Sequence, residues 1–460
     1  MTKKSIILSG VAASSALVWL ALAAHAADQP AAPASDLSQK PSWLTDLSLG
    51  VREGYDDNVF MGGVDPKYLP AYAVPPGSVA ALENRSSWVT TVSPKVGVNL
   101  VPLLDGQKTL SVLSLAYAPD FIIYHDQPWQ NYDAHRFAAA VKGQADHLSF
   151  SADNTLAYID GTRMGPSFPG GGDYFNAWAT VAEGQRVEQI QEVGRIALQY
   201  DWDRVFVRPT ASVMFYDVMS KLLDYPGADG YQNYPDRYDA NGGVDFGYKV
   251  TPGIALTLGY RYGHQYQEQL PWLSGGAPTD YSSTSDYQRL LFGAEGKPWK
   301  WLSMSLQGGP DFRSYDRTAP VNDLHPVKYY GQASVTAEAS SKDTVVFYYR
   351  QMQWVSICGK IPYFDSRFEL SYHRKLCDKL TLDLGARAWE ADYTSGNLDT
   401  SLRNDMLYMA SAGLTWLANS HLSFNLAYGA NLGRNLQDMA NSQYRDYDQN
   451  LVSLGAVLKL

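Results

Sequence analysis

The sequence predicts an all-β fold, a transmembrane antiparallel up-and-down β-barrel of about 18 strands, within a range of about 16 to 18. Three observations support this prediction. Apolar and polar side chains alternate along most of the chain, short turns alternate with long loops, and an apolar strand ends at the C-terminus itself. Such a terminal strand is an exposed edge, and closing a barrel pairs that edge.

The composition is that of a chain whose strands have one apolar and one polar face. The 460 residues are 45% hydrophobic and 13% aromatic, yet the mean hydropathy is only −0.27. Aromatic rings fall near predicted strand ends, where interfacial girdles would need them, as at Trp299, Trp301, Trp389 and Trp416. The alternative is a soluble β-sandwich or propeller exported to the periplasm.

The clearest strands allow their two faces to be assigned. In the segment 422–432 one face carries Leu422, Phe424, Leu426, Tyr428 and Leu432. The other face carries Ser423, Asn425, Gly429 and Asn431. That polar face is too rich for the packed core of a soluble barrel, so lipid is expected outside and water inside. Within residues 109–123 the apolar side changes near Ser114, which predicts a β-bulge.

Connections between the predicted strands are alternately short and long. The short ones are 102–108, 143–146, 201–203, 251–253, 297–300, 340–343, 377–379 and 419–421. The long ones are 56–87, 125–131, 160–183, 217–236, 267–285, 314–326, 356–362, 392–402 and 434–442. Short periplasmic turns and long outer loops are typical of outer-membrane barrels, and about nine hairpins give about 18 strands with both termini periplasmic.

The N-terminus has the features of an export signal. Lys3 and Lys4 precede an apolar run at residues 6–23, and Ala24-His25-Ala26 is a small-x-small cleavage site. Residues 1–26 are therefore predicted to be a signal peptide for the Sec pathway. Residues 27–43 are predicted to be a periplasmic N-terminal tether, and residues 44–460 the barrel. The alternative is a single anchoring helix, but Ser and Gly interrupt the apolar run.

The C-terminal strand resembles the terminal assembly signal of bacterial outer-membrane barrels. The residues that carry the resemblance are Ser453, Gly455, Leu458 and Leu460. It implies recognition by the barrel assembly machinery and insertion among outer-membrane lipid and lipopolysaccharide. Proteins with this signal usually end in Phe or Trp, where this chain has Leu.

Charge and cysteine content argue against several classes of function. The net charge of −10 becomes −12 once Lys3 and Lys4 leave with the signal peptide, which argues against nucleic acid as a partner. The only two cysteines, Cys358 and Cys377, form no metal motif. No cofactor and no metal are predicted.

Motifs that suggest catalysis or ion binding are incomplete. His-Leu-Ser at 147–149 and 421–423 matches the His-x-Ser unit of outer-membrane phospholipases, but lacks the Asn and Gly that follow it there. Asp-x-Asp-x-Asn at 446–450 has the spacing of a calcium loop without its glycine. Asp-Asp-Asn at 56–58 fits turn chemistry. The Gly run 170–172 lacks the residues of a phosphate loop. The chain is therefore not expected to be an enzyme.

Two features resemble the beta-barrel porin 2 family of Gram-negative outer membranes. They are Gly54-Tyr55-Asp56-Asp57-Asn58-Val59-Phe60 after the first predicted strand, and repeated hairpins such as residues 248–256. The resemblance covers nearly the whole mature chain. It implies a passive barrel, in a family in which some members are associated with exopolysaccharide systems.

On the predicted inner wall, basic side chains outnumber acidic ones. The predicted lumen-lining residues are Arg204, Arg208, Arg261, Arg289, Arg313, Arg367 and Arg387. Such a wall predicts a passive porin-like channel for anionic saccharides or small anionic solutes. The family resemblance implies exopolysaccharide-related export as a further possibility. One alternative is that these charges pair across strands and only solvate the wall. Another is a structural or surface-binding barrel whose long loops plug the lumen.

The terminal strand provides a test of assembly. Replacing both Leu458 and Leu460 with Asp should block insertion, because the apolar face of the recognition strand then carries two charges. The shift in electrophoretic mobility on heating, which reports folded barrels, should disappear from membrane fractions. A double variant that keeps the normal mobility shift would contradict the predicted signal.

Overall fold

The computed structural model describes residues 41–59, 86–104, 106, 108–162, 187–219, 222–223, 231–232, 236–271, 280–355, 362–393, 403–436 and 447–460. The chain divides into two units, Met1–Lys40 and Pro41–Leu460, and only the second contains described residues. The predicted signal peptide and most of the predicted tether lie outside the described residues and stay predictions. Within the described ranges, no helix is both long and apolar enough to cross a membrane.

The second unit is built almost entirely of strands. Those of the main sheet are β1 (Leu44–Asp56), β2 (Ser87–Asn99), β3 (Leu110–Tyr117), β4 (Asp120–Tyr124), β5 (Tyr132–Ala145), β6 (Leu148–Thr162), β7 (Val187–Trp202), β8 (Val205–Val218), β11 (Arg237–Thr251), β12 (Ile254–Gln267), β15 (Ser285–Trp299), β16 (Leu302–Tyr315), β17 (Val327–Ala337), β18 (Asp343–Trp354), β19 (Tyr363–Cys377), β20 (Leu380–Tyr393), β21 (Arg403–Leu417), β22 (Leu422–Asn435) and β23 (Tyr447–Lys459).

Four two-residue strands form two small ribbons outside that sheet. They are β9 (Leu222–Leu223) with β10 (Tyr231–Gln232), and β13 (Leu270–Pro271) with β14 (Asp280–Tyr281). Two single-turn 3-10 helices, η4 (Val101–Leu103) and η5 (Pro128–Gln130), lie in connections.

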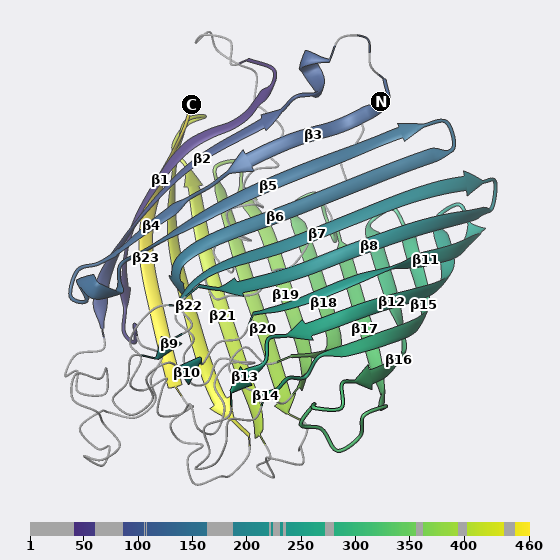
Figure 1. Ribbon diagram of the computed structural model, residues 1–460. Coiled ribbons are helices and arrows are strands. Elements are labelled where there is room, and N and C mark those ends of the chain that lie inside the picture. The colour runs from purple at the N-terminus through teal and green to yellow at the C-terminus, as the bar shows by residue number, and fades with distance from the viewer. Residues whose placement is uncertain are drawn as a thin grey trace. The chain divides into compact units, whose positions relative to one another are not determined.

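The main sheet is a closed antiparallel barrel in which strands follow one another in chain order (Figure 1). β1 pairs with β2 on one side and with β23 on the other, so the first and last strands close the ring. β3 and β4 both pair with β2 and β5 and together occupy one place. The barrel therefore has 18 strands, which confirms the predicted fold class and count.

The break between β3 and β4 occurs at Pro119, which has no N–H to donate to the ladder. The register is the same on both sides of the break, since Tyr117 faces Val96 and Phe121 faces Val92. The predicted bulge near Ser114 is wrong. The irregularity lies earlier, between Leu110 and Val112, where the pairing with β5 shifts.

Side-chain alternation divides the barrel into an apolar outward face and a polar inward face. On β22, Phe424, Leu426, Tyr428 and Leu432 are exposed on the outward face, as predicted. Buried side chains are to a large extent polar or charged, including Asp311, Arg313 and Asp365. This distribution is the reverse of that in a soluble barrel, where apolar side chains fill the interior.

Exposed aromatic rings lie near both ends of the outward face. Trp202, Trp299, Trp301 and Trp416 lie at the end with short connections, here called the turn end. Tyr55, Trp88, Tyr262 and Tyr329 lie toward the other end, here called the loop end. The expectation that Trp389 belongs to a girdle is wrong, because its side chain faces inward and is buried. Odd-numbered residues of β20 face the lumen, and Trp389 is one of them.

The loop end of the seam between β1 and β23 is fastened by two acidic segments that are far apart in sequence. The Asp57 carboxylate accepts hydrogen bonds from the Asn450 backbone N–H at 2.6 Å and from its side-chain amide at 2.7 Å. The Asp56 carboxylate accepts two from the Gln449 amide, at 3.1 and 3.0 Å. Asn58 donates to the Asp448 carbonyl at 2.8 Å. Both segments considered for cation binding thus hold the barrel closed.

The hydrogen bonds across this seam should stabilise the folded barrel. Asp57→Ala removes two charge-assisted hydrogen bonds and should destabilise the barrel by about 1.5–3 kcal/mol. The measurement is urea-induced unfolding of the protein refolded in detergent. Asp378→Ala, at an exposed position in the β19–β20 turn, is the control and should have little effect. Equal midpoints for both variants would contradict a fastening role for Asp57.

Candidate functional site: charged groups on the inner wall

The described part of the inner wall between β8 and β21 carries several ion-paired groups, of which four contain arginine. The first lies toward the turn end, where Arg208 binds Glu295 through two parallel hydrogen bonds of 2.8 and 2.9 Å. Arg208 also donates to Asp245 at 3.2 Å, and Arg261 lies 2.8 Å from the other oxygen of Asp245. A Cβ at Gly259 would lie 2.4 Å from the Asp245 carboxylate, so only glycine leaves room for it. This group has two cations and two anions.

The second group is more deeply buried. Arg289 on β15 donates to Asp311 on β16 at 2.8 Å, and Arg313 binds the same carboxylate at 3.1 and 3.2 Å. The Arg289 guanidinium lies between two rings, 4.0 Å from the centre of Tyr287 and 4.5 Å from that of Tyr330. All three charged side chains are at most 6% exposed. One buried carboxylate therefore serves two guanidinium groups, supported by cation–π contacts.

Polar side chains of neighbouring strands extend the second group. Arg313 donates to the side-chain oxygen (Oε1) of Gln265 at 2.7 Å, and the side-chain N–H of Gln265 donates to Asp239 at 2.9 Å. The Tyr287 hydroxyl donates to the other oxygen of Asp239 at 2.8 Å. The network thus runs without interruption from β16 through β12 and β15 to β11, and it satisfies most of the buried charge by direct hydrogen bonding.

In the third group, on β18 to β20, one carboxylate again binds two guanidinium groups. Arg367 binds both oxygens of Asp365, at 2.9 and 3.0 Å, and Arg350 lies 3.5 Å from the same carboxylate. The Arg367 guanidinium lies 4.0 Å from the centre of the Trp389 ring. This contact explains why Trp389 faces inward: its ring is the packing surface of a buried cation.

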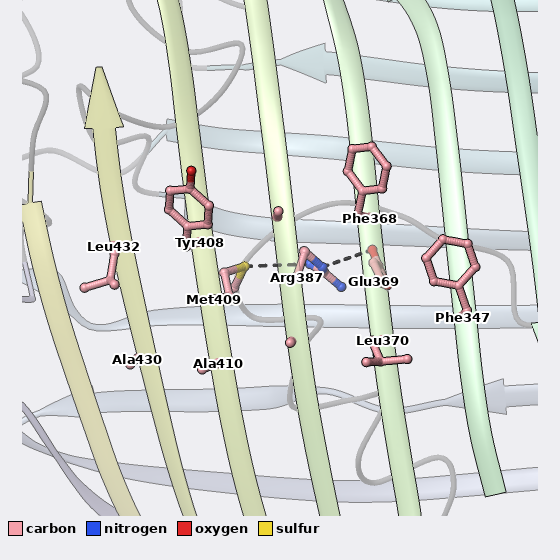
Figure 2. A pocket seen from close by; sticks show the side chains of 12 residues that line it. Phe347, Phe368, Glu369, Leu370, Arg387, Tyr408, Met409, Ala410, Ala430 and Leu432 are labelled. Carbon is pink, nitrogen blue, oxygen red and sulfur yellow. Dashed lines mark hydrogen bonds and ion pairs between the residues drawn. The ribbon is translucent and has the colours of Figure 1, made fainter. Parts of the chain in front are cut away.

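The fourth group is a single pair. Arg387 on β20 lies 3.0 Å from Glu369 on β19, and it also approaches the Met409 sulfur at 4.0 Å (Figure 2). Both charged side chains are partly exposed, 15% for Arg387 and 19% for Glu369. The His373–Asp383 pair on the same two strands is exposed to a similar extent, at 20% and 13%.

The last residues of β18 separate from β17. β17 pairs with β18 only from Ala337 to Gly331, so Met352 to Trp354 have no partner on that side. Their pairing with β19 continues to Trp354 and Tyr363. In place of β17, side chains from distant strands form hydrogen bonds with this segment. The Gln353 carbonyl accepts from Gln265 at 3.0 Å and from Arg313 at 3.2 Å.

Arg237 holds the same segment from β11. Its guanidinium donates to the Val355 carbonyl at 2.8 Å and lies 4.7 Å from the Tyr216 ring centre and 5.4 Å from that of Trp354. Around it, a buried cluster joins the loop ends of β8, β18, β19 and β20, with Tyr216, Met352, Trp354, Tyr363, Ala391 and Tyr393 as its members. The segment Gln353–Val355 therefore lies across the interior of the barrel.

A hollow of about 350 Å³ lies on the outward face of β18 to β22 (Figure 2). Its floor is a row of three register partners with small side chains, Ala386, Ala410 and Ala430. Its rim includes exposed Phe368 and Tyr408. The hollow faces away from the lumen and belongs to the apolar surface.

Most of the sequence-predicted lumen residues lie in these groups. Arg208, Arg261, Arg289, Arg313, Arg367 and Arg387 are all on inward positions of strands and in ion pairs. Arg204 differs, because it lies exposed in the turn between β7 and β8 and its carbonyl accepts from the Lys249 N–H. The sequence interpretation missed Arg237 and Gln265, although both occupy the inward positions shared by Asp239 and Arg261 on the same strands.

The predicted assembly residues lie as the strand period requires. Ser453 is buried on the inward side, and Gly455 faces Arg52 of β1 and Asn425 of β22. Leu458 and Leu460 are exposed on the outward side. Recognition of this strand by an assembly machinery stays a prediction.

The remaining motifs supply no chemistry in the described part of the chain. The His-Leu-Ser triplets at 147–149 and 421–423 lie at the turn end, and the ring of His421 contacts the Lys459 carbonyl. Across the described residues, no group of three or more His, Cys, Asp or Glu side chains could hold a metal ion. The Gly run 170–172 and Cys358 lie outside the described residues, and Cys377 is a free, exposed thiol.

Comparisons with known proteins give structural similarity only. No family model and no curated protein sequence matches the chain, so the resemblance to the beta-barrel porin 2 family stays a prediction. The siderophore receptor PirA of Acinetobacter baumannii is 8% identical, with 91% of this chain and 81% of that chain covered and a TM-score of 0.41.

Two further solved structures are similar at the same level. The FrpB iron transporter of Neisseria meningitidis is 8% identical over 90% of this chain and 81% of its own, with a TM-score of 0.44. The outer-membrane protein opdK of Pseudomonas aeruginosa is 11% identical over 90% of this chain and 99% of its own, with a TM-score of 0.40.

The second group yields a test of buried charge. Asp311→Ala leaves Arg289 and Arg313 without their shared carboxylate and should destabilise the barrel by about 3–5 kcal/mol, or prevent folding. The measurement is the temperature at which the folded electrophoretic form is lost. Arg374→Ala, which removes an exposed partner of Asp343, is the control and should change that temperature little. Similar transition temperatures for Asp311→Ala and Arg374→Ala would show that the Asp311 group contributes little to the stability of the barrel.

Proposed function

We propose that this protein is a passive outer-membrane channel of the porin type that passes anions more readily than cations. The observation that carries the proposal is the third ion-paired group of the inner wall, where Asp365 serves both Arg350 and Arg367. This group keeps one uncompensated positive charge, whereas the second group has Asp239 as well as Asp311 near its two arginines. In a wall of low dielectric constant, the field of the charge in the third group extends into the lumen and raises the local concentration of anions.

The outward face supports the membrane location. Large apolar side chains such as Ile196, Phe292 and Leu454 are more than half exposed on it. Water would not stabilise such a surface, whereas lipid would, and a closed barrel leaves no unpaired backbone groups in lipid. The predicted signal peptide agrees with export to the outer membrane.

The proposed solutes are anionic saccharides or other small anions, including the acidic units of exopolysaccharides. Guanidinium groups suit them because a planar fork of donors binds carboxylate and phosphate oxygens in pairs. The proposal involves no enzyme activity, no cofactor and no nucleic acid. The outer-membrane lipid, lipopolysaccharide and the barrel assembly machinery are the proposed partners.

A structural or surface-binding barrel is the second candidate. It is favoured by the buried cluster that includes Tyr216, Trp354 and Tyr393, because this cluster fills part of the interior at the loop end. Planar-bilayer recordings distinguish the two functions. A channel gives discrete conductance steps, and its reversal potential in a salt gradient has the sign for anions. A structural barrel gives no steps, and that result would overturn the proposal.

The Arg387 pair predicts selectivity changes of opposite sign. Glu369→Gln frees the Arg387 charge and should increase anion preference, whereas Arg387→Gln should decrease it. Both shifts in reversal potential should fade between about 0.01 M and about 1 M salt, because the Debye length falls from about 30 Å to about 3 Å. Arg374→Gln, on the outward face, is the control. Shifts of the same sign in both variants would contradict the electrostatic explanation.

A further inference from the structure

On the part of the inner wall that the structure describes, one cation of β5 and one of β7 have no partner. Lys142 and Arg195 occupy inward positions, because Phe137 and Ile196, at the alternate positions of the same strands, are exposed on the apolar face. Neither cation forms an ion pair or a side-chain hydrogen bond within the described ranges. Asp153 on β6 faces Arg195 in the ladder, yet it is also without an ion pair among these residues. The three side chains together leave one positive charge in excess.

Cations at matching depth on other strands are bound by carboxylates. Arg261 on β12 and Arg387 on β20 lie as many residues from the turn end of their strands as Arg195 does, and each is in an ion pair. Arg208 on β8 lies as far from the turn end as Lys142 does, and two carboxylates bind it. The lack of partners is therefore a property of this part of the ring and not of depth.

Three lysines at the turn end have no ion pair with any described residue either, but they lie closer to bulk water. Lys297, Lys375 and Lys459 are all within the last three residues of their strands. Salt screens such exposed charges within about 8 Å at physiological ionic strength. Arg195 lies near the middle of β7, and Lys142 is on the other side of β6 from it. These two are therefore the cations that a solute inside the barrel can meet together.

The ladder of β6 fixes the spacing of the two cations. Lys142 is the register partner of Ser151, and Arg195 is that of Asp153, two residues further along β6. Two strand spacings of about 4.8 Å and one two-residue step of about 6.7 Å place the Cα atoms roughly 12 Å apart. Because both side chains are long, one organic anion can contact both.

The wall around the two cations is low and partly hydroxylated. Its inward neighbours on β5 to β8 are Ala138, Ala140, Ser151, Thr155, Ala197 and Ser212. Ala138 and Thr155 are exposed, so water reaches this wall. Hydroxyl side chains both donate and accept hydrogen bonds, as the hydroxyls of a sugar do. No ring covers the Arg195 guanidinium within the described residues, whereas Trp389 covers that of Arg367.

We infer that Lys142 and Arg195 form a binding site for a carboxylate-bearing sugar on the inner wall. The inference rests on the proposed channel function and deepens it, because it names where the solute binds. A carboxylate that meets an unpaired cation displaces only water, whereas one that meets a paired arginine must also displace the carboxylate already bound. Asp153 lies beside the site and limits its charge, so the solute binds and is also released.

Collisional quenching measures the charge at this site without requiring conductance. In a background with Cys358→Ser and Cys377→Ser, a neutral fluorophore is attached to Ala138→Cys in the folded protein in detergent. The ratio of quenching by iodide to quenching by neutral acrylamide reports the local concentration of anions. Lys142→Gln and Arg195→Gln should each lower this ratio roughly 1.5- to 2-fold at about 0.1 M salt.

Two further variants establish the sign and the location of the effect. Asp153→Asn removes the negative charge beside the site and should raise the iodide ratio. Arg374→Gln removes one positive charge from the outward face and should leave the ratio unchanged. The differences between variants should vanish at about 1 M salt, where the Debye length is about 3 Å. Electrophoretic mobility before and after heating shows that each variant is folded.

Competition identifies the class of ligand. At constant ionic strength, sodium glucuronate should lower the iodide ratio of the unmodified site, sodium acetate should lower it less, and glucose should not change it. In the double variant Lys142→Gln, Arg195→Gln, glucuronate should have no more effect than acetate. Equal effects of glucuronate and acetate on the unmodified site would show a general attraction of anions and would overturn the sugar site.

The result for the site is separate from the result for the channel. Iodide ratios that stay the same in Lys142→Gln and Arg195→Gln would overturn the site, even in a protein that conducts. Lowered ratios and competition by glucuronate, in a protein that gives no conductance steps in bilayers, would overturn the channel function and leave the site intact. In a conducting protein, glucuronate should reduce the chloride current, and the double variant should remove this block.

Discussion

The pairing of β1 with β23 is the constraint on which the rest of the structure depends. A strand in lipid has no water to satisfy its backbone groups, so an open sheet would leave two costly edges. The ladder from Ser48 and Lys459 to Asp56 and Leu451 removes both edges at once. Because closure fixes the number of strands, it also creates an interior too wide for apolar side chains from the wall to fill.

A wide interior explains the chemistry of the inner wall. Charged side chains there are only partly hydrated, and a lone buried ion is expensive, so each is bound by partners on neighbouring strands. Asp311 and Asp365 each bind two arginines, and the rings of Tyr287 and Trp389 cover the guanidinium faces. These groups stiffen the wall, and the group around Asp365 leaves a positive surplus on it.

Much of the fold could be predicted from the sequence, and less of the site. The two-residue period fixes which side of a strand each residue faces, so Arg208 and Arg387 could be assigned to the inner wall. The position of Arg204 could not be predicted in this way, because alternation does not show at which residue a strand ends and a turn begins. The contact of Gln265 with Gln353 joins residues 88 positions apart. It exists only because the end of β18 leaves its ladder with β17, and alternation contains no signal for that departure.

The segment Gln353–Val355, which lies across the interior, is held by its main chain. Arg237, Gln265 and Arg313 bind carbonyl oxygens, which every amino acid supplies. Within the described residues, both amide atoms of the Gln353 side chain lack a hydrogen-bond partner. Substitutions at position 353 therefore change the size and polarity of the side chain in the interior while the backbone hydrogen bonds that hold the segment are retained. The interior of the barrel is open to change by mutation at this position without loss of the wall around it.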